Sequence, residues 1–352
     1  METMTSMERV LTTLSHKEPD RVPFFLLLTM HGAKELGLSI EEYFSKPENI
    51  VEGQLRLREK YQHDCYYPFT YAAVEVEAFG GDVKYVSNGP PNAGSPIIKN
   101  RRDIEKLKVP DVKNTPCLRK ALNTIELLKV EAGEDVPIIG VVVSPFSLPV
   151  MQMGFPDYLD LLLHDKESFY QLMAVNELFC VQWANAQLAA GATAICYFDP
   201  VASPSMVPAS LYRKSGLDVA KRTLPQINGL VATHFASGTC LEIIEDVVST
   251  GTGAVGVGED EDINELKEKS RGRLSLIGNL NGIKMCSWPP QEARSSVTDL
   301  LSKAAPGGGF ILADGHGEIP WQVPDEVLHA MSTTVRQCGT YPITSPEEIR
   351  TL

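Results

Sequence analysis

The chain has 352 residues, of which 43% are hydrophobic and 22% are charged, a composition typical of a folded protein with a large core. Its 45 acidic side chains outnumber the 32 basic ones, and the formal charge of −13 argues against a nucleic-acid partner, which needs a cationic surface. Seven cysteines without a CxxC pair form no disulfide framework, and no window of 18 uninterrupted apolar residues could cross a membrane, so we expect a cytoplasmic protein without a membrane segment.

Short apolar runs alternate with helical stretches along the whole chain. Several runs, such as PIIGVVVS at 137–144, are apolar almost throughout, which is typical of parallel strands that are covered on both faces. The predicted strands are eight in number and span residues 22–28, 64–69, 137–144, 193–199, 229–234, 253–258, 274–278 and 308–313.

The helical stretches between these runs begin and end at proline and glycine signals. The clearest helices are predicted within 47–61, 165–191 and 239–251. Eight strands alternating with helices predict an α/β fold, a single (β/α)8 TIM barrel over residues 1–352 with an N-terminal helical extension. The segment 81–115 is rich in Gly, Pro and Asn and predicts an excursion over one face of the barrel. An open doubly wound sheet is the alternative, but no glycine-rich nucleotide motif follows the first strand.

Residues just past the carboxyl ends of barrel strands converge on one site, so their identities indicate the chemistry. His316 lies between two glycines in DGHGEIP, and these would let the backbone present the imidazole. Glu259 and Asp260 follow a strand but could equally be the acidic first turn of a helix. Besides these three, the strand-end candidates are Tyr71, Glu75, Glu77, Ser144, Phe146, Asp199, His234, Asn279 and Glu318.

Six short segments resemble the uroporphyrinogen decarboxylase superfamily, in the same order along the chain. They are KEPDRVPFF, VEVEAFGG, GDVKY, VSPFSLP, LIGNLNG and DGHGEIP. The resemblance covers nearly the whole chain, and it implies a (β/α)8 barrel, in agreement with the strand count.

Two chemistries compete within this superfamily. Its true decarboxylases carry arginines after strand one and an aspartate after strand two, whereas here strand one continues as LLLTMHGAKEL and Tyr71 stands at the aspartate position. VEVEAFGG and FDPVASPSMVP are instead similar to the corrinoid-dependent methyltransferases. The resemblance therefore implies methyl transfer to the cobalamin of a separate corrinoid protein, and it ranks uroporphyrinogen decarboxylation behind that activity.

Members of the methyltransferase branch bind one zinc ion through a His-x-Cys pair at strand five and a cysteine at strand eight. This chain keeps His234, but Ala236 and His316 stand where the two cysteines would be. The resemblance then implies a Zn²⁺ ligand set of His234, His316 and a carboxylate, for which Glu77 is the predicted residue and Glu75 the alternative. Such an ion would polarise an oxygen more strongly than one held by thiolates. In a metal-free site, His234 would only bond its neighbours.

We therefore predict a zinc-dependent O-demethylating methyltransferase that moves a methyl group from a methoxylated aromatic compound to a corrinoid protein. The alternatives are methanol, a methylamine or a thiol such as coenzyme M as substrate, and a non-catalytic barrel that only docks a partner. Analogy with the family allows a homodimer. The candidate catalytic residues are His234, His316, Asp199 and Tyr71, the candidate substrate-binding residues are Phe69, Phe146, Met151 and Asn279, and Asp199 or Glu318 could orient an imidazole.

Overall fold

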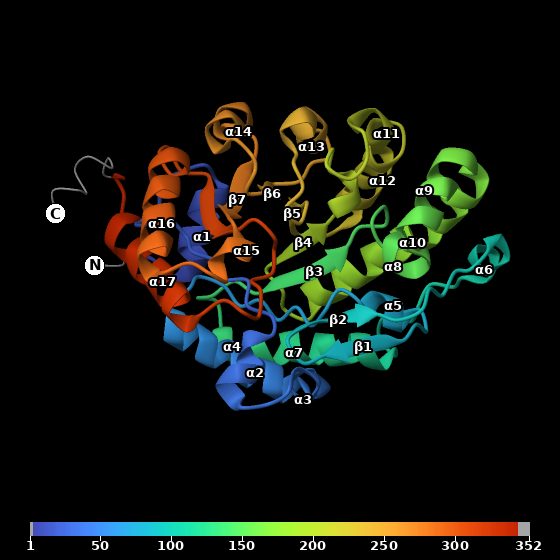
Figure 1. Ribbon diagram of the computed structural model, residues 1–352, viewed down its shortest axis with the longest axis horizontal. Coiled ribbons are helices and arrows are strands. Elements are labelled where there is room, and N and C mark those ends of the chain that lie inside the picture. Colours follow the sequence, from blue (N-terminus) through green and yellow to red (C-terminus); the bar gives the residue numbers. More distant parts are fainter. Residues whose placement is uncertain (1–2, 344–352) are drawn as a thin grey trace.

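A parallel sheet of six strands forms the centre of the computed structural model, which describes residues 3–343 (Figure 1). The strands pair in chain order, each one parallel to the next, from β3 to β8. Their bounds are β3 Ile139–Val143, β4 Ala194–Phe198, β5 Leu230–His234, β6 Ala254–Gly256, β7 Ser275–Leu280 and β8 Phe310–Asp314. Most of their residues are buried, because helices cover the outer face and side chains fill the inner one.

Two extended segments, 22–28 and 64–69, lie between the edge strands β8 and β3. The first is joined to β8 by a parallel bridge, and the second is joined to the start of β3 in the same way. The hydrogen bonds that establish this order run from Phe25 N–H to the Leu312 carbonyl (2.8 Å), from Asp64 N–H to Phe24 (2.7 Å) and from Ile139 N–H to Tyr66 (3.0 Å). The fold is thus the predicted (β/α)8 barrel, with extended segments in two of the eight strand positions.

The prediction of regular strands at 22–28 and 64–69 was wrong in this respect. Pro23 and Pro68 have no backbone N–H, and each interrupts the ladder of hydrogen bonds that a strand needs. The other six predicted strands are confirmed, with ends that differ by a few residues.

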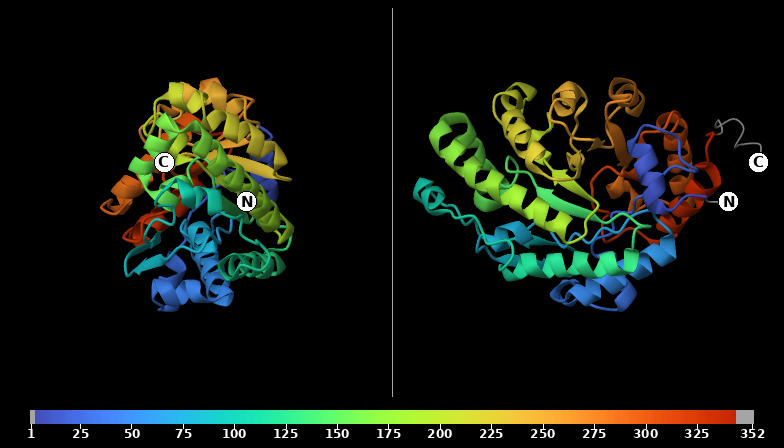
Figure 2. Two further views of the ribbon diagram at one scale, coloured as in Figure 1. Left: turned by 90° about the vertical axis from the view of Figure 1, so that its right-hand side faces the viewer. Right: turned by 180° about the vertical axis from the view of Figure 1, so that it is seen from behind.

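Helices surround the strands on the outside of the barrel (Figures 1 and 2). They are α1 Ser6–Leu14, α2 His31–Leu36, α3 Ile40–Ser45, α4 Pro47–Tyr61, α5 Val74–Ala78, α6 Arg101–Lys106, α7 Pro116–Ala132, α8 Pro149–Met153, α9 Phe155–His164, α10 Lys166–Ala189, α11 Ala209–Arg213, α12 Gly216–Thr223, α13 Ile244–Val248, α14 Ile263–Ser270, α15 Gly282–Met285, α16 Pro290–Ala304 and α17 Asp325–Cys338. None of the helices within residues 3–343 has both the length and the apolar character needed to cross a bilayer.

The N-terminal helix α1 packs against the barrel interior. Val10 belongs to the same buried cluster as Phe25, Cys196 and Ile311, whose side chains fill the space inside the strands. Buried ion pairs hold this end together, because Asp64 accepts hydrogen bonds from the guanidinium groups of Arg9 and Arg21. The predicted N-terminal helical extension therefore lies against the barrel.

The predicted excursion at 81–115 contains an antiparallel hairpin and a short helix. The hairpin consists of β1 Val83–Val86 and β2 Gly89–Ala93, and helix α6 follows it. Gln322, which follows β8, donates a hydrogen bond to the Asn88 carbonyl at the tip of the hairpin (2.9 Å). The hairpin is thereby tied to a segment that follows the carboxyl end of β8.

Candidate active site

His234 is the last residue of β5 and is buried at the centre of the candidate site. Its ring stacks on that of Phe198, with centroids 4.9 Å apart and planes inclined by 25°. The other side of the ring lies against Gly256, where a Cβ atom would come within 2.1 Å of the imidazole. Only glycine in β6 therefore leaves room for His234 in this position.

The protonation of His234 follows from its surroundings. Burial lowers its pKa to about 4, and a charge on the nearby His316 acts in the same direction, so the ring is neutral near pH 7. The Ala236 backbone N–H donates to Nδ1 (3.0 Å), so Nδ1 is the unprotonated nitrogen. The proton is therefore on Nε2, which is buried and has no hydrogen-bond partner in residues 3–343.

His316 lies in the turn after β8 and is the more accessible of the two imidazoles. Its side chain is 26% exposed. The buried carboxylate of Asp314 holds the turn by accepting the backbone N–H groups of His316 and Gly317, both at 2.9 Å. Nδ1 of His316 shares a short hydrogen bond with the Ser237 hydroxyl and lies 3.8 Å from Glu259 Oε2. A hydroxyl and a carboxylate thus hold one side of the ring, which leaves Nε2 as the nitrogen that can meet a substrate.

The loop after β5 has the backbone conformation that brings Ser237 to His316. Ala236 and Ser237 have φ angles of 49° and 70°, a region that residues other than glycine adopt at a cost. The Ser237 N–H also donates to the Gly315 carbonyl (2.8 Å), so the loops after β5 and β8 are joined at two points. Strained backbone of this kind is typical of functional sites.

Three buried carboxyl groups lie at the same end of the barrel, and none of them forms an ion pair with an arginine or lysine of residues 3–343. Asp199 accepts hydrogen bonds from the hydroxyls of Ser144 (2.6 Å) and Ser147 (2.7 Å), and burial raises its pKa to about 6. Burial likewise raises the pKa of Asp314 to about 6 and that of Glu318, which bonds the Thr29 hydroxyl, to about 7. The role in orienting an imidazole that we predicted for Asp199 or Glu318 is not seen, since their partners are hydroxyl groups.

Tyr71 and Glu77 contact each other beside the hairpin. The Tyr71 hydroxyl donates to Glu77 Oε2 (2.7 Å), and the Tyr71 ring packs edge-on against Phe44 and Tyr85. The predicted catalytic residue Tyr71 and the predicted metal ligand Glu77 therefore form a pair of their own. The alternative ligand, Glu75, accepts the Val143 backbone N–H (2.8 Å) within the core.

The fit of a metal ion depends on how many ligands converge and on which nitrogen of each imidazole is unprotonated. Within residues 3–343, no group of three or more His, Cys, Asp or Glu side chains is arranged to hold one, so His234, His316 and Glu77 do not form a ligand set as placed. In addition, a histidine that ligates a metal through one nitrogen usually donates a proton from the other. His234 instead accepts at Nδ1, so Nε2 carries the proton and offers no lone pair. The arrangement does not fit zinc, and the zinc ion stays a prediction.

The four predicted substrate-binding residues lie in different surroundings. Phe69 stacks parallel to Phe198, with centroids 6.3 Å apart, and so extends the aromatic stack that begins at His234. Phe146 is fully buried among the rings of other core residues, which marks it as a packing residue. Met151 lines a groove of about 300 Å³ beside the hairpin. The Asn279 amide donates to the Gly258 carbonyl (3.0 Å).

Three residues of the site are not among the predicted catalytic, substrate-binding and metal-binding residues. Glu259 follows β6 as the strand-end rule requires, but we left it open as the first turn of a helix; its Oε2 atom is buried and has no hydrogen-bond partner within residues 3–343. Ser237 has no local signal, because its role depends on a loop conformation that the sequence does not indicate. Phe198, the ring beneath His234, is the last residue of β4 and has the pattern of any core strand.

Comparison with known proteins agrees with this architecture. Residues 5–338 match the family model "Uroporphyrinogen decarboxylase (URO-D)". The uroporphyrinogen decarboxylase of Xylella fastidiosa is 26% identical over 350 residues, which cover 92% of this chain and 96% of the relative. That of Coxiella burnetii is 24% identical over 353 residues, with 94% of each chain covered.

Solved structures share the fold. A methyltransferase from Methanosarcina mazei superimposes with a TM-score of 0.85 at 22% identity, over 95% of this chain and 99% of that one. A B12-independent methionine synthase from Shewanella sp. W3-18-1 follows with a TM-score of 0.56 at 13% identity, over 89% and 91% of the two chains. With a family model that matches almost its whole length, this chain belongs to the uroporphyrinogen decarboxylase family.

Proposed function

We propose that the protein is a methyltransferase that moves a methyl group from a methoxylated aromatic compound to the cobalamin of a separate corrinoid protein. The observation that carries the proposal is a partly exposed imidazole, His316, in a site where no arginine or lysine of residues 3–343 forms an ion pair with the buried carboxyl groups of Asp199, Asp314 and Glu318. A polycarboxylate substrate would need arginines there, whereas a neutral ether needs only an acid for its oxygen.

The residues around His316 are suited to protonating a leaving oxygen. An aryl ether leaves as a phenolate, and a proton delivered to its oxygen in the transition state makes it a better leaving group. The Glu259 carboxylate lies 3.8 Å from Nδ1 of His316, and the Ser237 hydroxyl fixes the direction of the ring through its hydrogen bond to the same nitrogen.

In the proposed step, the methyl group passes from the ether oxygen to the cobalt of the partner's cobalamin. The reduced cobalt of the partner's cobalamin supplies an electron pair to the methyl carbon. As the carbon–oxygen bond breaks, the oxygen keeps the electron pair of that bond and accepts the proton from Nε2 of His316 in the same step. The products are a phenol and a methylated corrinoid, and His316 regains its proton from water. His234 stays neutral throughout, because burial lowers its pKa to about 4.

A spectroscopic assay tests the proposal directly. Free cob(I)alamin serves as methyl acceptor, and its conversion to methylcobalamin is followed by absorbance with methoxybenzoates, 2-methoxyphenol, methanol and methylamine as donors. We expect turnover with at least one methoxylated aromatic compound. Turnover with methanol or methylamine alone would show that the protein is a methyltransferase but that its substrate is not an aromatic ether. Failure with every donor would contradict the proposal.

Substitution of His316 tests its role as the acid that protonates the leaving oxygen. His316→Ala should lower the rate about 10²- to 10⁴-fold, the usual contribution of a general acid. The matched control is His164→Ala, because the His164 side chain is 71% exposed on α9 and should leave the rate unchanged. An unaltered rate in His316→Ala would contradict the assigned role.

Elemental analysis of the same preparations tests the predicted zinc site separately. If the protein contains one zinc ion per chain and both His234→Ala and His316→Ala lose it, the two histidines are zinc ligands. In that case Nε2 of His234 must give up its proton to bind the ion. Zinc far below one per chain in a protein that turns over would support catalysis by the protein's own acid.

A further inference from the structure

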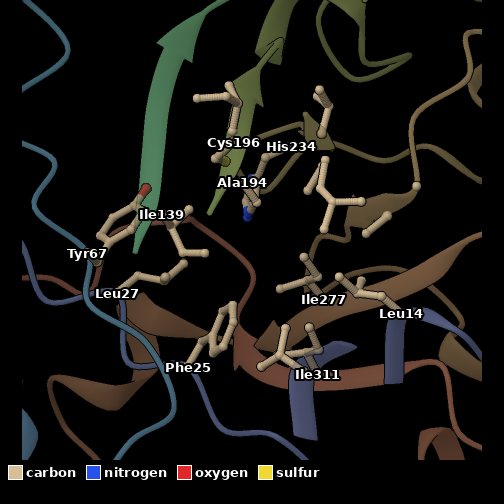
Figure 3. A pocket seen from close by; sticks show the side chains of 17 residues that line it. Leu14, Phe25, Leu27, Tyr67, Ile139, Ala194, Cys196, His234, Ile277 and Ile311 are labelled. Carbon is tan, nitrogen blue, oxygen red and sulfur yellow. The ribbon is translucent and has the colours of Figure 1, made fainter. Parts of the chain in front are cut away.

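The inside of the barrel contains an apolar cavity below the candidate active site. Its volume is about 120 Å³, and it is lined mainly by aliphatic and aromatic side chains from α1 and from the strands (Figure 3). Barrel interiors are ordinarily filled by layers of side chains, so an open space of this size is a departure from the usual packing. Leu14, Phe25, Ile277 and Ile311 form much of its wall.

The cavity reaches the surface at the amino ends of the strands. Leu230, the first residue of β5, lines it and is 44% exposed. Gly253, just before β6, also lines it and is exposed. A small molecule therefore has a route into the barrel at the end opposite to His316.

One polar atom in the cavity wall has no partner. Of the buried side-chain atoms in residues 3–343 that lack a hydrogen bond, only Nε2 of His234 belongs to a residue lining this cavity. The other polar side chain in the wall with a strong donor, Tyr67, already donates to the Gly317 carbonyl (3.1 Å). Because Nδ1 of His234 accepts from Ala236, Nε2 is a hydrogen-bond donor, and an unpaired buried donor is costly unless a ligand completes it.

We propose that the barrel interior binds a neutral aromatic ring about the size of benzene that presents a single hydrogen-bond acceptor to Nε2 of His234. An apolar wall with one convergent polar group is the usual construction of a small-molecule site. An engineered apolar cavity of about 150 Å³ is known to bind benzene, so the space is of the right order for one ring. A charged ligand is excluded, because nothing in the wall would pair with it.

Pyridine and benzene form a matched pair of probes for this site. They have the same shape, pyridine is uncharged at pH 8, and only pyridine has an acceptor atom. Neither carries a methyl ether, so the test is independent of the proposed methyl transfer. We expect both to bind saturably by isothermal titration calorimetry, and pyridine to perturb the ring nitrogen signals of His234 in protein labelled with ¹⁵N-histidine.

Three variants locate the site and identify the donor. Ala194→Leu fills the cavity and should weaken the binding of both probes at least tenfold, whereas Ala189→Leu, at an exposed position of α10, should leave it unchanged. His234→Phe keeps a ring but removes the donor. The ratio of pyridine to benzene affinity should then fall about 5- to 100-fold, since the pyridine nitrogen would be buried unpaired.

The binding measurements test the cavity and the hydrogen-bond donor separately. Absence of saturable binding of either probe to the natural protein would overturn it, as would undiminished binding in Ala194→Leu. An unchanged pyridine-to-benzene ratio in His234→Phe would overturn the role of Nε2. If thermal unfolding shows that Ala194→Leu is not folded, Cys196→Met, which enlarges another residue of the wall, takes its place.

Discussion

His234 and His316 are close neighbours, yet their surroundings give them different chemistry. His234 is buried between Phe198 and Gly256, and burial together with the charge of His316 lowers its pKa to about 4. His316 is partly exposed and lies 3.8 Å from the carboxylate of Glu259. The buried ring is therefore suited to donating a fixed hydrogen bond from Nε2, whereas the partly exposed ring is placed to meet a substrate.

The contact between Gly256 and His234 predicts the effect of adding one methyl group. In Gly256→Ala, the new Cβ would lie 2.1 Å from Cδ2 of His234, and both the ring and the loop behind it must shift. We expect a loss of about 1–3 kcal/mol in the free energy of unfolding, the usual cost of overpacking, and at least a tenfold lower methyl-transfer rate. Urea unfolding and the cobalamin assay measure the two effects.

Gly251→Ala is the control for this substitution. Gly251 has a φ angle of +84° but no atom within 4 Å of an added Cβ, so the change brings backbone strain without a collision. Gly251→Ala should lower the free energy of unfolding by about 1 kcal/mol and leave the methyl-transfer rate unaltered. Equal stability and equal rates in the two variants would show that the ring does not depend on the glycine beneath it.

At the scale of elements, the short helix α5 inserts an ionisable group into the core beside β3. Glu75 is buried, Oε1 accepts the Val143 N–H, and Oε2 has no hydrogen-bond partner in the described part of the chain. Burial raises the pKa of Glu75 to about 8. The carboxyl group is therefore protonated in the folded protein at pH 7, and α5 packs against the barrel as a neutral element.

This raised pKa predicts how stability changes with pH. The unfolded chain releases the Glu75 proton near its ordinary value of 4.5, whereas the folded chain keeps it up to about pH 8. Stability from this group is therefore fully present below pH 4.5 and is lost as the pH rises to 8, by about 1.4 kcal/mol per pH unit. Glu75→Gln keeps the acceptor for Val143 and cannot ionise, so it should gain stability relative to the natural protein between pH 5 and 8.

Urea unfolding of both proteins at several pH values measures this difference. The exposed residue Glu48 in the first turn of α4 provides the control, because Glu48→Gln changes the same chemical group without burial. A constant difference between Glu75→Gln and the natural protein across this range would contradict the raised pKa.

The elements also show which features local sequence can predict. Helix α4 spans Pro47–Tyr61 as predicted, because proline at its first position is a local signal. The helix predicted at 239–251 is shortened to α13, since the carboxylate of Glu261 accepts the N–H groups of Cys240 and Leu241 and holds that turn in another conformation. Such a contact between distant residues leaves no trace in the local pattern.

In the candidate site, too, local sequence predicts some features, whereas contacts between distant residues decide others. The strand-end rule correctly brought His234 and His316 to one end of the barrel, because the positions of strand ends follow from periodicity. The partners of His316 could not be predicted, since Ser237 reaches it only through a loop with positive φ angles. Glu77 was assigned to the metal from the resemblance and from its place after the second predicted strand. Its hydrogen-bond partner, Tyr71, lies just before the helix that carries Glu77, α5.

At the scale of the whole molecule, the charge distribution limits which substrates the protein can bind. The chain carries a formal charge of −13. None of the ion pairs found within residues 3–343 joins an arginine or lysine to Asp199, Asp314 or Glu318, and the pKa values of all three are raised by burial. A substrate with many carboxylates would therefore meet like charges or protonated acids where it needs cations.

This field predicts that the protein does not bind the substrate after which its family is named. Uroporphyrin, the fluorescent oxidised form of that substrate, serves as the probe in a fluorescence titration, with the Xylella fastidiosa relative as the positive control. Like charges brought together in a binding site cost several kcal/mol, so we expect affinity for uroporphyrin at least about a hundredfold below that of the control. The protein should also release no carbon dioxide from uroporphyrinogen. Affinity equal to that of the control, together with decarboxylation, would instead show that cations reach the mouth of the barrel and that methyl transfer is the wrong activity.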